Sequence, residues 1–188
     1  KYRDTIRLYC DTTGSNDPVE FGKKIKLRMD EGFTWMKMDI GSGMLRNTPG
    51  TISRPVGGTD RSRPEHSTSG IELTLKGCEM MADYIMKVRE VVGWETPIST
   101  DHFGTMGVNS IIKLGKAFEK CNLAWMEDTV PWYRTDLLKQ IHDALDVPIC
   151  TGEDIYLMEP FEVLCKNSAV DIIQPDLSTS GGILETKR

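Results

Sequence analysis

Several features that would place this chain in other protein classes are scarce or absent. The five cysteines among its 188 residues form no closely spaced pair and lie singly in apolar runs, which argues against a disulfide framework. No apolar run approaches the ~20 residues of a membrane-spanning helix, and the first residues lack the apolar core of a signal peptide. The net charge of −5, with Lys and Arg scattered along the chain, argues against a nucleic-acid surface. We therefore expect a cytoplasmic protein that binds neither nucleic acid nor a membrane.

The chain instead alternates short apolar runs with segments of helical period. Strand, helix, strand is the repeating unit of a parallel sheet, so the alternation predicts an α/β fold. The predicted strands are residues 6–12, 33–40, 97–101, 124–128, 147–153 and 171–176. The predicted helices are residues 19–31, 70–93, 108–122, 133–145 and 160–169. Residues 42–69 are rich in Gly and Pro without periodicity, which predicts a long irregular loop.

Three acidic residues end three of these apolar runs at equal intervals. Asp101 closes PISTD, Glu127 closes LAWME and Glu153 closes VPICTGE, with 26 residues from each acid to the next. In a closed parallel barrel the ends of successive strands converge on one face, where such folds place their chemistry. Three carboxylates meeting there repel one another unless a hard cation neutralises them, and Mg²⁺ prefers oxygen ligands. The spacing therefore predicts a Mg²⁺ site, and a fourth acid, Asp176, ends the run DIIQPD.

Two other interpretations of these acids stay open at this point. Strand-end Asp and Glu residues also cap the helices that follow them. A barrel or half-barrel without catalytic activity, which binds a metal or a partner, would carry the same ligands. Metal-dependent exchange of a substrate α-proton with solvent separates an enzyme from such a scaffold.

The order of these residues resembles the barrel domain of the enolase superfamily, in its mandelate racemase and muconate lactonizing branch. The resemblance runs from about residue 6 to the end, and it rests on Lys37 in WMKMDIG, Asp101, Glu127 in WMED, Glu153 in TGED and Asp176 in QPD followed by GG. It implies a (β/α) TIM-type barrel, of which residues 1–188 hold about six of eight strands as a partial catalytic domain. It also implies one Mg²⁺ on the three strand-end acids, which binds the substrate carboxylate and stabilises the enediolate formed when a base removes the α-proton.

Lys37 and Asp39 share one face of a predicted strand at the barrel mouth. Members of the resembling family often carry lysine at both positions, with the second as the base, whereas this chain has Asp39 at the second. Either Lys37 acts as the base, with its pKa lowered by neighbouring cations and burial, or Asp39 does so or binds a substrate hydroxyl. A structural ion pair between Lys37 and Asp39 is the alternative without catalysis.

Two further residues are interpreted from their places beside these acids. Some dehydratases of the family place a catalytic histidine two residues after the first metal ligand, but Phe103 stands there, and strict alternation predicts that His102 points away from the barrel axis. Asp176 is implied to pair with a histidine at the end of the next strand, as a second acid/base. No histidine lies between Asp176 and Arg188, which places the expected partner beyond Arg188. The alternative is that Asp176 caps the backbone before SGG.

These expectations combine into one predicted function. The resemblance implies a Mg²⁺-dependent enzyme acting on a small-molecule carboxylate, and the polar loop with Asp39 suits a polyhydroxylated substrate, hence an acid-sugar dehydratase. Racemisation, epimerisation and cycloisomerisation share the first proton removal and stay open as alternatives. The family's capping domain has no counterpart in these residues, so we expect them to belong to a longer chain that forms a homo-oligomer.

Overall fold

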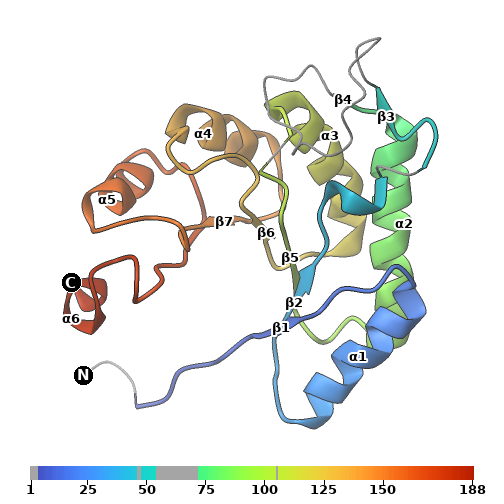
Figure 1. Ribbon diagram of the computed structural model, residues 1–188, viewed down its shortest axis with the longest axis horizontal. Helices are drawn as coiled ribbons and strands as arrows, with labels where there is room; N and C mark the ends of the chain where they lie inside the picture. The colour runs from blue at the N-terminus through green and yellow to red at the C-terminus, as the bar shows by residue number, and fades with distance from the viewer. Residues whose placement is uncertain (1–3, 46–47, 54–71, 105) are drawn as a thin grey trace.

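The computed structural model describes residues 4–45, 48–53, 72–104 and 106–188. Six strands form one parallel sheet in the order β1-β2-β5-β6-β7-β8 (Figure 1). They are β1 (Cys10–Thr12), β2 (Met36–Asp39), β5 (Ile98–Asp101), β6 (Met126–Glu127), β7 (Ile149–Thr151) and β8 (Ile172–Ile173). Each lies within a run that the sequence predicts as a strand, so the predicted α/β fold with a parallel sheet is confirmed.

Helices follow the strands and surround the sheet. They are α1 (Pro18–Asp30), α2 (Leu75–Val92), α3 (Val108–Phe118), α4 (Thr135–Ala144), α5 (Glu159–Lys166) and α6 (Ile183–Lys187), with the 3₁₀ turns η1 (Ser42–Leu45) and η2 (Glu119–Cys121). Figure 1 shows α1 to α5 in an arc around the strands, in chain order, and each of α1, α2 and α3 contacts the next. This is the winding of a β/α barrel, in which a helix follows each strand.

The predicted loop at residues 42–69 is described only in part, because residues 46–47 and 54–71 lie outside the described residues. Its described part holds η1 and strand β3 (Ile52–Ser53), which pairs antiparallel with β4 (Glu72–Leu73). Helix α2 therefore begins at Leu75 and not at residue 70 as predicted. Thr74 caps it, with its hydroxyl oxygen accepting a hydrogen bond from the Gly77 N–H at 3.1 Å.

Helix α1 begins and ends within one residue of the predicted range, 19–31. Asp17 Oδ1 accepts hydrogen bonds from the backbone N–H groups of Val19 (2.8 Å) and Glu20 (3.2 Å), and Pro18 takes the first helical position. Just beyond the helix, Gly32 has φ 101°, a conformation that glycine adopts readily.

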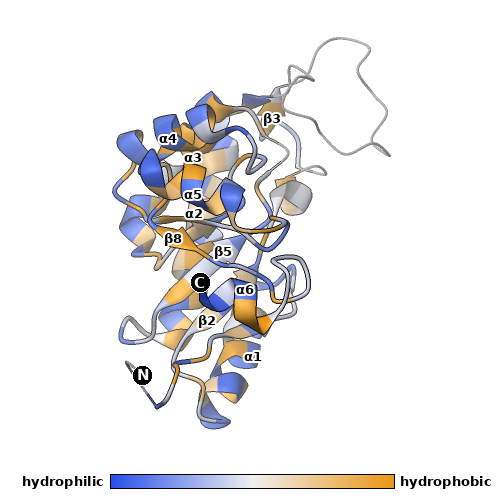
Figure 2. Cartoon of the chain, turned by 90° about the vertical axis from the view of Figure 1, so that its left-hand side faces the viewer, coloured by the Kyte–Doolittle hydropathy of each residue, from blue (hydrophilic) through white to orange (hydrophobic). Residues whose placement is uncertain are grey.

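Successive side chains along a strand point to opposite faces of the sheet, so one face packs against the helices and the other carries polar residues. In β2, Met36 and Met38 are buried in the hydrophobic core, whereas Lys37 between them points to the other side of the sheet. The helices contribute Phe21 and Ile85 among others to this core, and Figure 2 shows that they carry both hydrophobic and hydrophilic residues, as amphipathic helices do. Within the described ranges, no helix has the length and apolar character needed to cross a membrane.

A buried arginine ties α2 to the segments that lead into β5 and β6. Arg89 is 1% exposed, and its guanidinium donates to the carbonyl oxygens of Thr96 (2.8 Å), Cys121 (3.1 Å) and Asn122 (2.6 Å). Burial lowers the pKa of Arg89. These hydrogen bonds fix the backbone that leads into β5 and β6, the two strands that carry the acids described below.

We predict that Arg89→Met lowers the free energy of unfolding by at least about 2 kcal/mol, because the carbonyl oxygens placed around the guanidinium lose their donor. Urea denaturation measures the effect. Lys87, an exposed residue on the same helix, provides the matched control, and Lys87→Met should change stability by no more than about 0.5 kcal/mol. Equal effects of the two substitutions would contradict this role of Arg89.

Candidate metal and proton-transfer site

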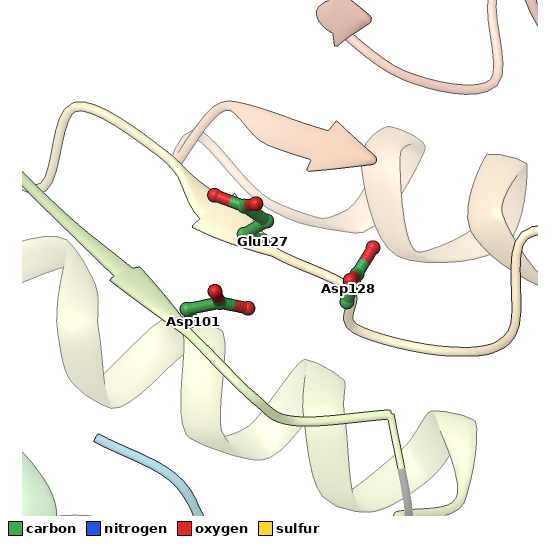
Figure 3. Close-up of side chains that lie close together, drawn as sticks. All are labelled: Asp101, Glu127 and Asp128. Atoms are coloured by element: carbon green, nitrogen blue, oxygen red, sulfur yellow. The ribbon is translucent and has the colours of Figure 1, made fainter. Parts of the chain in front are cut away.

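Two strand-end carboxylates meet at one edge of the sheet. Asp101 ends β5, Glu127 ends β6, and each residue is 1% exposed. Figure 3 shows them on neighbouring strands, with Asp128 next along the chain. One ligand oxygen from each of these three residues lies within 4.8 Å of the others. The structure thus brings together two of the three acids that the sequence spacing selects.

The third carboxylate of this close group is Asp128, which the sequence analysis did not select. Strand alternation would turn Asp128 to the face opposite Glu127, but its φ of 48° leaves the extended conformation and the carboxylates come together. Its Oδ1 accepts a hydrogen bond from the Thr151 hydroxyl at 2.7 Å. The sequence does carry one indication of Asp128, because the second acid of WMED directly follows the strand-end acid Glu127.

Glu153 lies outside this close group but at the same mouth of the sheet. It is exposed and follows Gly152 after β7. Together with His102 and Asp128 it lines a cavity of about 480 Å³. The other lining residues are Gly104, Val130, Pro131, Trp132, Tyr133 and Asp154. Both Asp128 and Glu153 are therefore candidates for a third ligand beside Asp101 and Glu127.

A buried lysine bridges the two strand-end acids. Lys37 Nζ lies 2.7 Å from Asp101 Oδ2 and 3.4 Å from Glu127 Oε1, and the residue is 4% exposed. Burial lowers the pKa of Lys37, but the hydrogen bond to Asp101 and the charge of Glu127 outweigh it, so the pKa is raised. In the described residues the ion pairs of Lys37 join it to these two acids, and not to Asp39 as one interpretation of the sequence had it.

In the acids near Lys37, burial has the opposite effect and raises the pKa. The pKa of Glu127 rises to about 7, mainly through burial and the charge of Asp101, although Lys37 and a hydrogen bond from Trp125 oppose the rise. The pKa of Asp128 rises to about 6, again mainly through burial. Both groups are therefore harder to ionise than a carboxyl group in water, even with Lys37 beside Glu127.

The donor set fits a divalent cation. All three ligand atoms are carboxylate oxygens, which hard cations prefer, and two of the three residues are buried. A bound cation would stabilise the ionised forms that burial disfavours. The geometry therefore suits a divalent metal, with Asp101 and Glu127 as its central ligands.

Aromatic side chains surround Lys37 and Glu127 on the interior side. Trp125 Nε1 donates to Glu127 Oε2 at 2.9 Å, and the Trp125 ring centroid lies 5.0 Å from that of Trp35 and 5.6 Å from that of Tyr9. Lys37 Nζ lies 5.6 Å from the centroid of the Tyr9 ring. Trp125 was not among the residues predicted from the sequence. It stands two residues before Glu127, and the two-residue period of a strand puts both side chains on one face.

At the mouth of the site, Asp39 pairs with His102. Asp39 Oδ1 lies 2.6 Å from His102 Nε2, and the strand register sets Asp39 opposite Asp101. His102 lines the cavity and has φ 74°, so the strict alternation on which the prediction of its direction rested breaks at this residue. Gly41 permits the approach, since a Cβ there would lie 2.9 Å from the His102 carbonyl oxygen.

Asp176 is exposed and bonds to the backbone that follows it. Its Oδ1 accepts hydrogen bonds from the N–H groups of Ser178 (2.7 Å) and Thr179 (3.2 Å). These bonds lower the pKa of the Asp176 carboxyl. The contacts match the alternative interpretation of Asp176 as a cap before SGG, and its acid/base role stays a prediction.

We predict that the cation-free protein loses stability as the pH rises from about 5 to 8. Folding raises the pKa of Glu127 from 4.5 to about 7, so the stability contributed by its protonation is complete below 4.5 and is lost as the pH passes through 7. Urea unfolding in EDTA measures the decline, and Glu127→Gln, which removes the titrating group, should reduce it. Added Mg²⁺ should stabilise the protein more at pH 8 than at pH 5. A rise in stability over this range in EDTA, with the same slope in Glu127→Gln, would contradict the prediction.

The chain is similar in sequence to known proteins over its whole length. The profile of the family described as "Enolase C-terminal domain-like" matches residues 20–188. D-xylonate dehydratase of Haloferax volcanii is 27% identical over 191 residues, which cover 100% of this chain and 42% of that protein. L-talarate/galactarate dehydratase of Salmonella typhimurium is 32% identical over 121 residues, which cover 63% of this chain and 30% of that protein. The chain thus spans less than half the length of either relative.

The fold is likewise that of a known structure. The mandelate racemase/muconate lactonizing enzyme-like protein from Rubrobacter xylanophilus DSM 9941 matches with a TM-score of 0.78 at 25% identity, over 100% of this chain and 47% of that one. The six parallel strands therefore form part of a TIM-type barrel, as the resemblance implied. The family profile covers most of the chain, and the barrel strands carry acids at their ends. This chain therefore belongs to the enolase superfamily, and it corresponds to the C-terminal domain of that family.

Proposed function

We propose that this chain carries the catalytic barrel of a Mg²⁺-dependent acid-sugar dehydratase, which removes the proton α to the carboxylate of its substrate. The observation that carries the proposal is the buried group of Asp101 and Glu127 with Lys37 Nζ within 2.7 Å and 3.4 Å of their oxygens. The names of the two relatives, D-xylonate dehydratase and L-talarate/galactarate dehydratase, support an acid sugar as substrate.

The chemistry explains why acids and a lysine stand together. A proton next to a carboxylate is very weakly acidic, because its removal adds a second negative charge to an anion. A divalent cation, when bound, supplies positive charge where the second negative charge develops. Asp101 and Glu127 would hold it, with Glu153 as the third ligand expected from the spacing and Asp128 as the third by proximity. The burial of Asp101 and Glu127 excludes water, which strengthens the electrostatic interactions of these two ligands.

Lys37 is the residue best placed to take the α-proton. Its ammonium lies inside the site, beside the ligand oxygens of Asp101, and its raised pKa reflects the acids around it. A cation bound to those acids would offset their charge, so they would stabilise the ammonium less. The pKa of Lys37 would then fall, which favours the neutral amine that a base requires. Asp39, exposed at the mouth and paired with His102, is the alternative base or a partner for a substrate hydroxyl.

The cavity suits a small polyhydroxylated carboxylate. Its volume of about 480 Å³ lies in the usual range for small-molecule sites, and its lining combines acids with the adjacent rings of Trp132 and Tyr133. Racemisation and cycloisomerisation share the first proton removal, and the names of the relatives favour dehydration among the three.

We predict that Glu127→Gln and Asp101→Asn each weaken Mg²⁺ binding by a factor of about 10 or more, because each removes a charged ligand oxygen. Isothermal titration measures the affinity, and Glu90→Gln, an exposed residue on α2, serves as the control. Glu153→Gln and Asp128→Asn, measured in parallel, show which acid completes the site. Wild-type affinity in the first two variants would overturn the proposed cation site.

We predict that Lys37→Met, at saturating Mg²⁺, lowers kcat on the acid sugar that the protein turns over by a factor of about 10² or more. It should also stop exchange of the substrate α-proton in D₂O, followed by NMR, because the neutral amine is lost. Asp39→Asn is the comparison, and retained exchange in that variant fits Asp39 as a partner of a hydroxyl. Normal exchange in a folded Lys37→Met variant would transfer the base to Asp39. Wild-type protein with Mg²⁺ that exchanges no α-proton from any acid sugar would favour a binding scaffold.

A further inference from the structure

Gln174 lies directly after β8, where its backbone is held against the end of β7. Its N–H donates to the Thr151 carbonyl oxygen at 3.0 Å. Gly152 has φ 146°, and a Cβ on it would lie 2.8 Å from the Gln174 nitrogen. Only a residue without a side chain permits this approach, so Gly152 helps to place Gln174 beside the acid site.

One orientation of the Gln174 amide satisfies both Glu127 and the Tyr9 hydroxyl. In it, Nε2 donates to both oxygens of Glu127, at 3.1 Å to Oε1 and 3.3 Å to Oε2, and the amide oxygen accepts from the Tyr9 hydroxyl. The opposite orientation would set the amide oxygen against two carboxylate oxygens. The Glu127 carboxylate, which only accepts, therefore selects the direction in which the amide donates, and the Tyr9 hydroxyl, which can donate or accept, bonds to the other end of the amide.

Among the residues that the structure describes, Gln174 is one of three whose side chains donate to the Glu127 carboxylate. Trp125 Nε1 lies 2.9 Å from Oε2, and Lys37 Nζ lies 3.4 Å from Oε1. The three donors come from separate parts of the sheet: Trp125 precedes β6, Lys37 belongs to β2 and Gln174 follows β8. Trp125 and Gln174 are uncharged, so they orient the carboxylate without cancelling the charge that a cation needs.

We propose that Gln174 is a positioning residue, which holds the Glu127 carboxylate in the orientation that binds a divalent cation, with the Tyr9 hydroxyl anchoring the other end of the Gln174 amide. The proposal rests on the proposed function in one respect, that Glu127 is a ligand of the cation. Hydrogen-bonded partners of metal ligands typically change metal affinity by a factor of about 10 to 100 when they are removed. Gln174 is half-buried, so its substitution changes the ligand's orientation with little change in the core.

The test is Mn²⁺ binding to the purified protein, measured by electron paramagnetic resonance. Gln174→Leu keeps the approximate size of the side chain and removes the donor, and we expect its Kd for Mn²⁺ to rise by a factor of about 10 or more. Tyr9→Phe, which removes the hydrogen bond that anchors the amide oxygen, should shift the Kd in the same direction by a smaller factor. The matched control is Gln140→Leu, an exposed glutamine on α4, which should leave the Kd unchanged. Urea unfolding without a cation checks that the variants are folded.

The outcomes separate this proposal from the proposed function. Loss of binding in Glu127→Gln together with wild-type affinity in Gln174→Leu would overturn the positioning role and leave the cation site standing. Wild-type affinity in both variants would remove the cation site itself. If Gln174→Leu does not fold, Tyr9→Phe decides the matter, because wild-type affinity in that variant contradicts the network from Tyr9 through Gln174 to Glu127.

Discussion

The burial of two carboxylates inside a parallel sheet is the constraint on which the rest of the structure depends. Asp101 and Glu127 are almost fully removed from water, and an ionised carboxylate is stable there only with a positive charge and hydrogen-bond donors around it. Lys37 supplies the positive charge from β2, the strand that neighbours β5 with its Asp101. A shift of one residue in the register of β2 would bring Met38 to the acids and turn Lys37 into the helix-facing core. The register of β2 against β5 is therefore tied to the ionic group.

The strand ends bring further side chains to this group by leaving the extended conformation. His102 follows β5 with φ 74°, Asp128 follows β6 with φ 48°, and Gly152 follows β7 with φ 146°. Such conformations are uncommon for residues with a side chain. In His102, the backbone N–H donates to Asp101 Oδ1 at 2.6 Å, which helps to hold the turn. Three successive strands thus end in turns that face the same cavity.

The charge balance at the mouth links the architecture to the proposed chemistry. Asp101, Glu127, Asp128 and Glu153 lie in or beside the cavity, and in the described residues the ion pairs of the Lys37 ammonium reach two of them, Asp101 and Glu127. An anionic substrate would be repelled by this excess of acids. A divalent cation would offset two of these negative charges and supply a positive point that a substrate carboxylate could bind, which the acids without it would repel. The neutral donors Trp125 and Gln174 keep the ligand in place without reducing that effect.

The amino-acid sequence by itself determined the strands, the helices and the convergence of Asp101 with Glu127. Helix caps such as Asp17 and alternation around Lys37 act over a few residues, and a repeated β/α unit places strand-end acids on one edge, so local patterns suffice for these features. Asp128 and His102 escaped the same reasoning, since a single positive φ reverses the face to which a side chain points. The hydrogen bond between Tyr9 and Gln174 joins residues 165 positions apart, which stand next to the two edge strands of the sheet, before β1 and after β8. Only the tertiary structure decided that contact, because it depends on how the whole sheet curves and on no pattern within either segment.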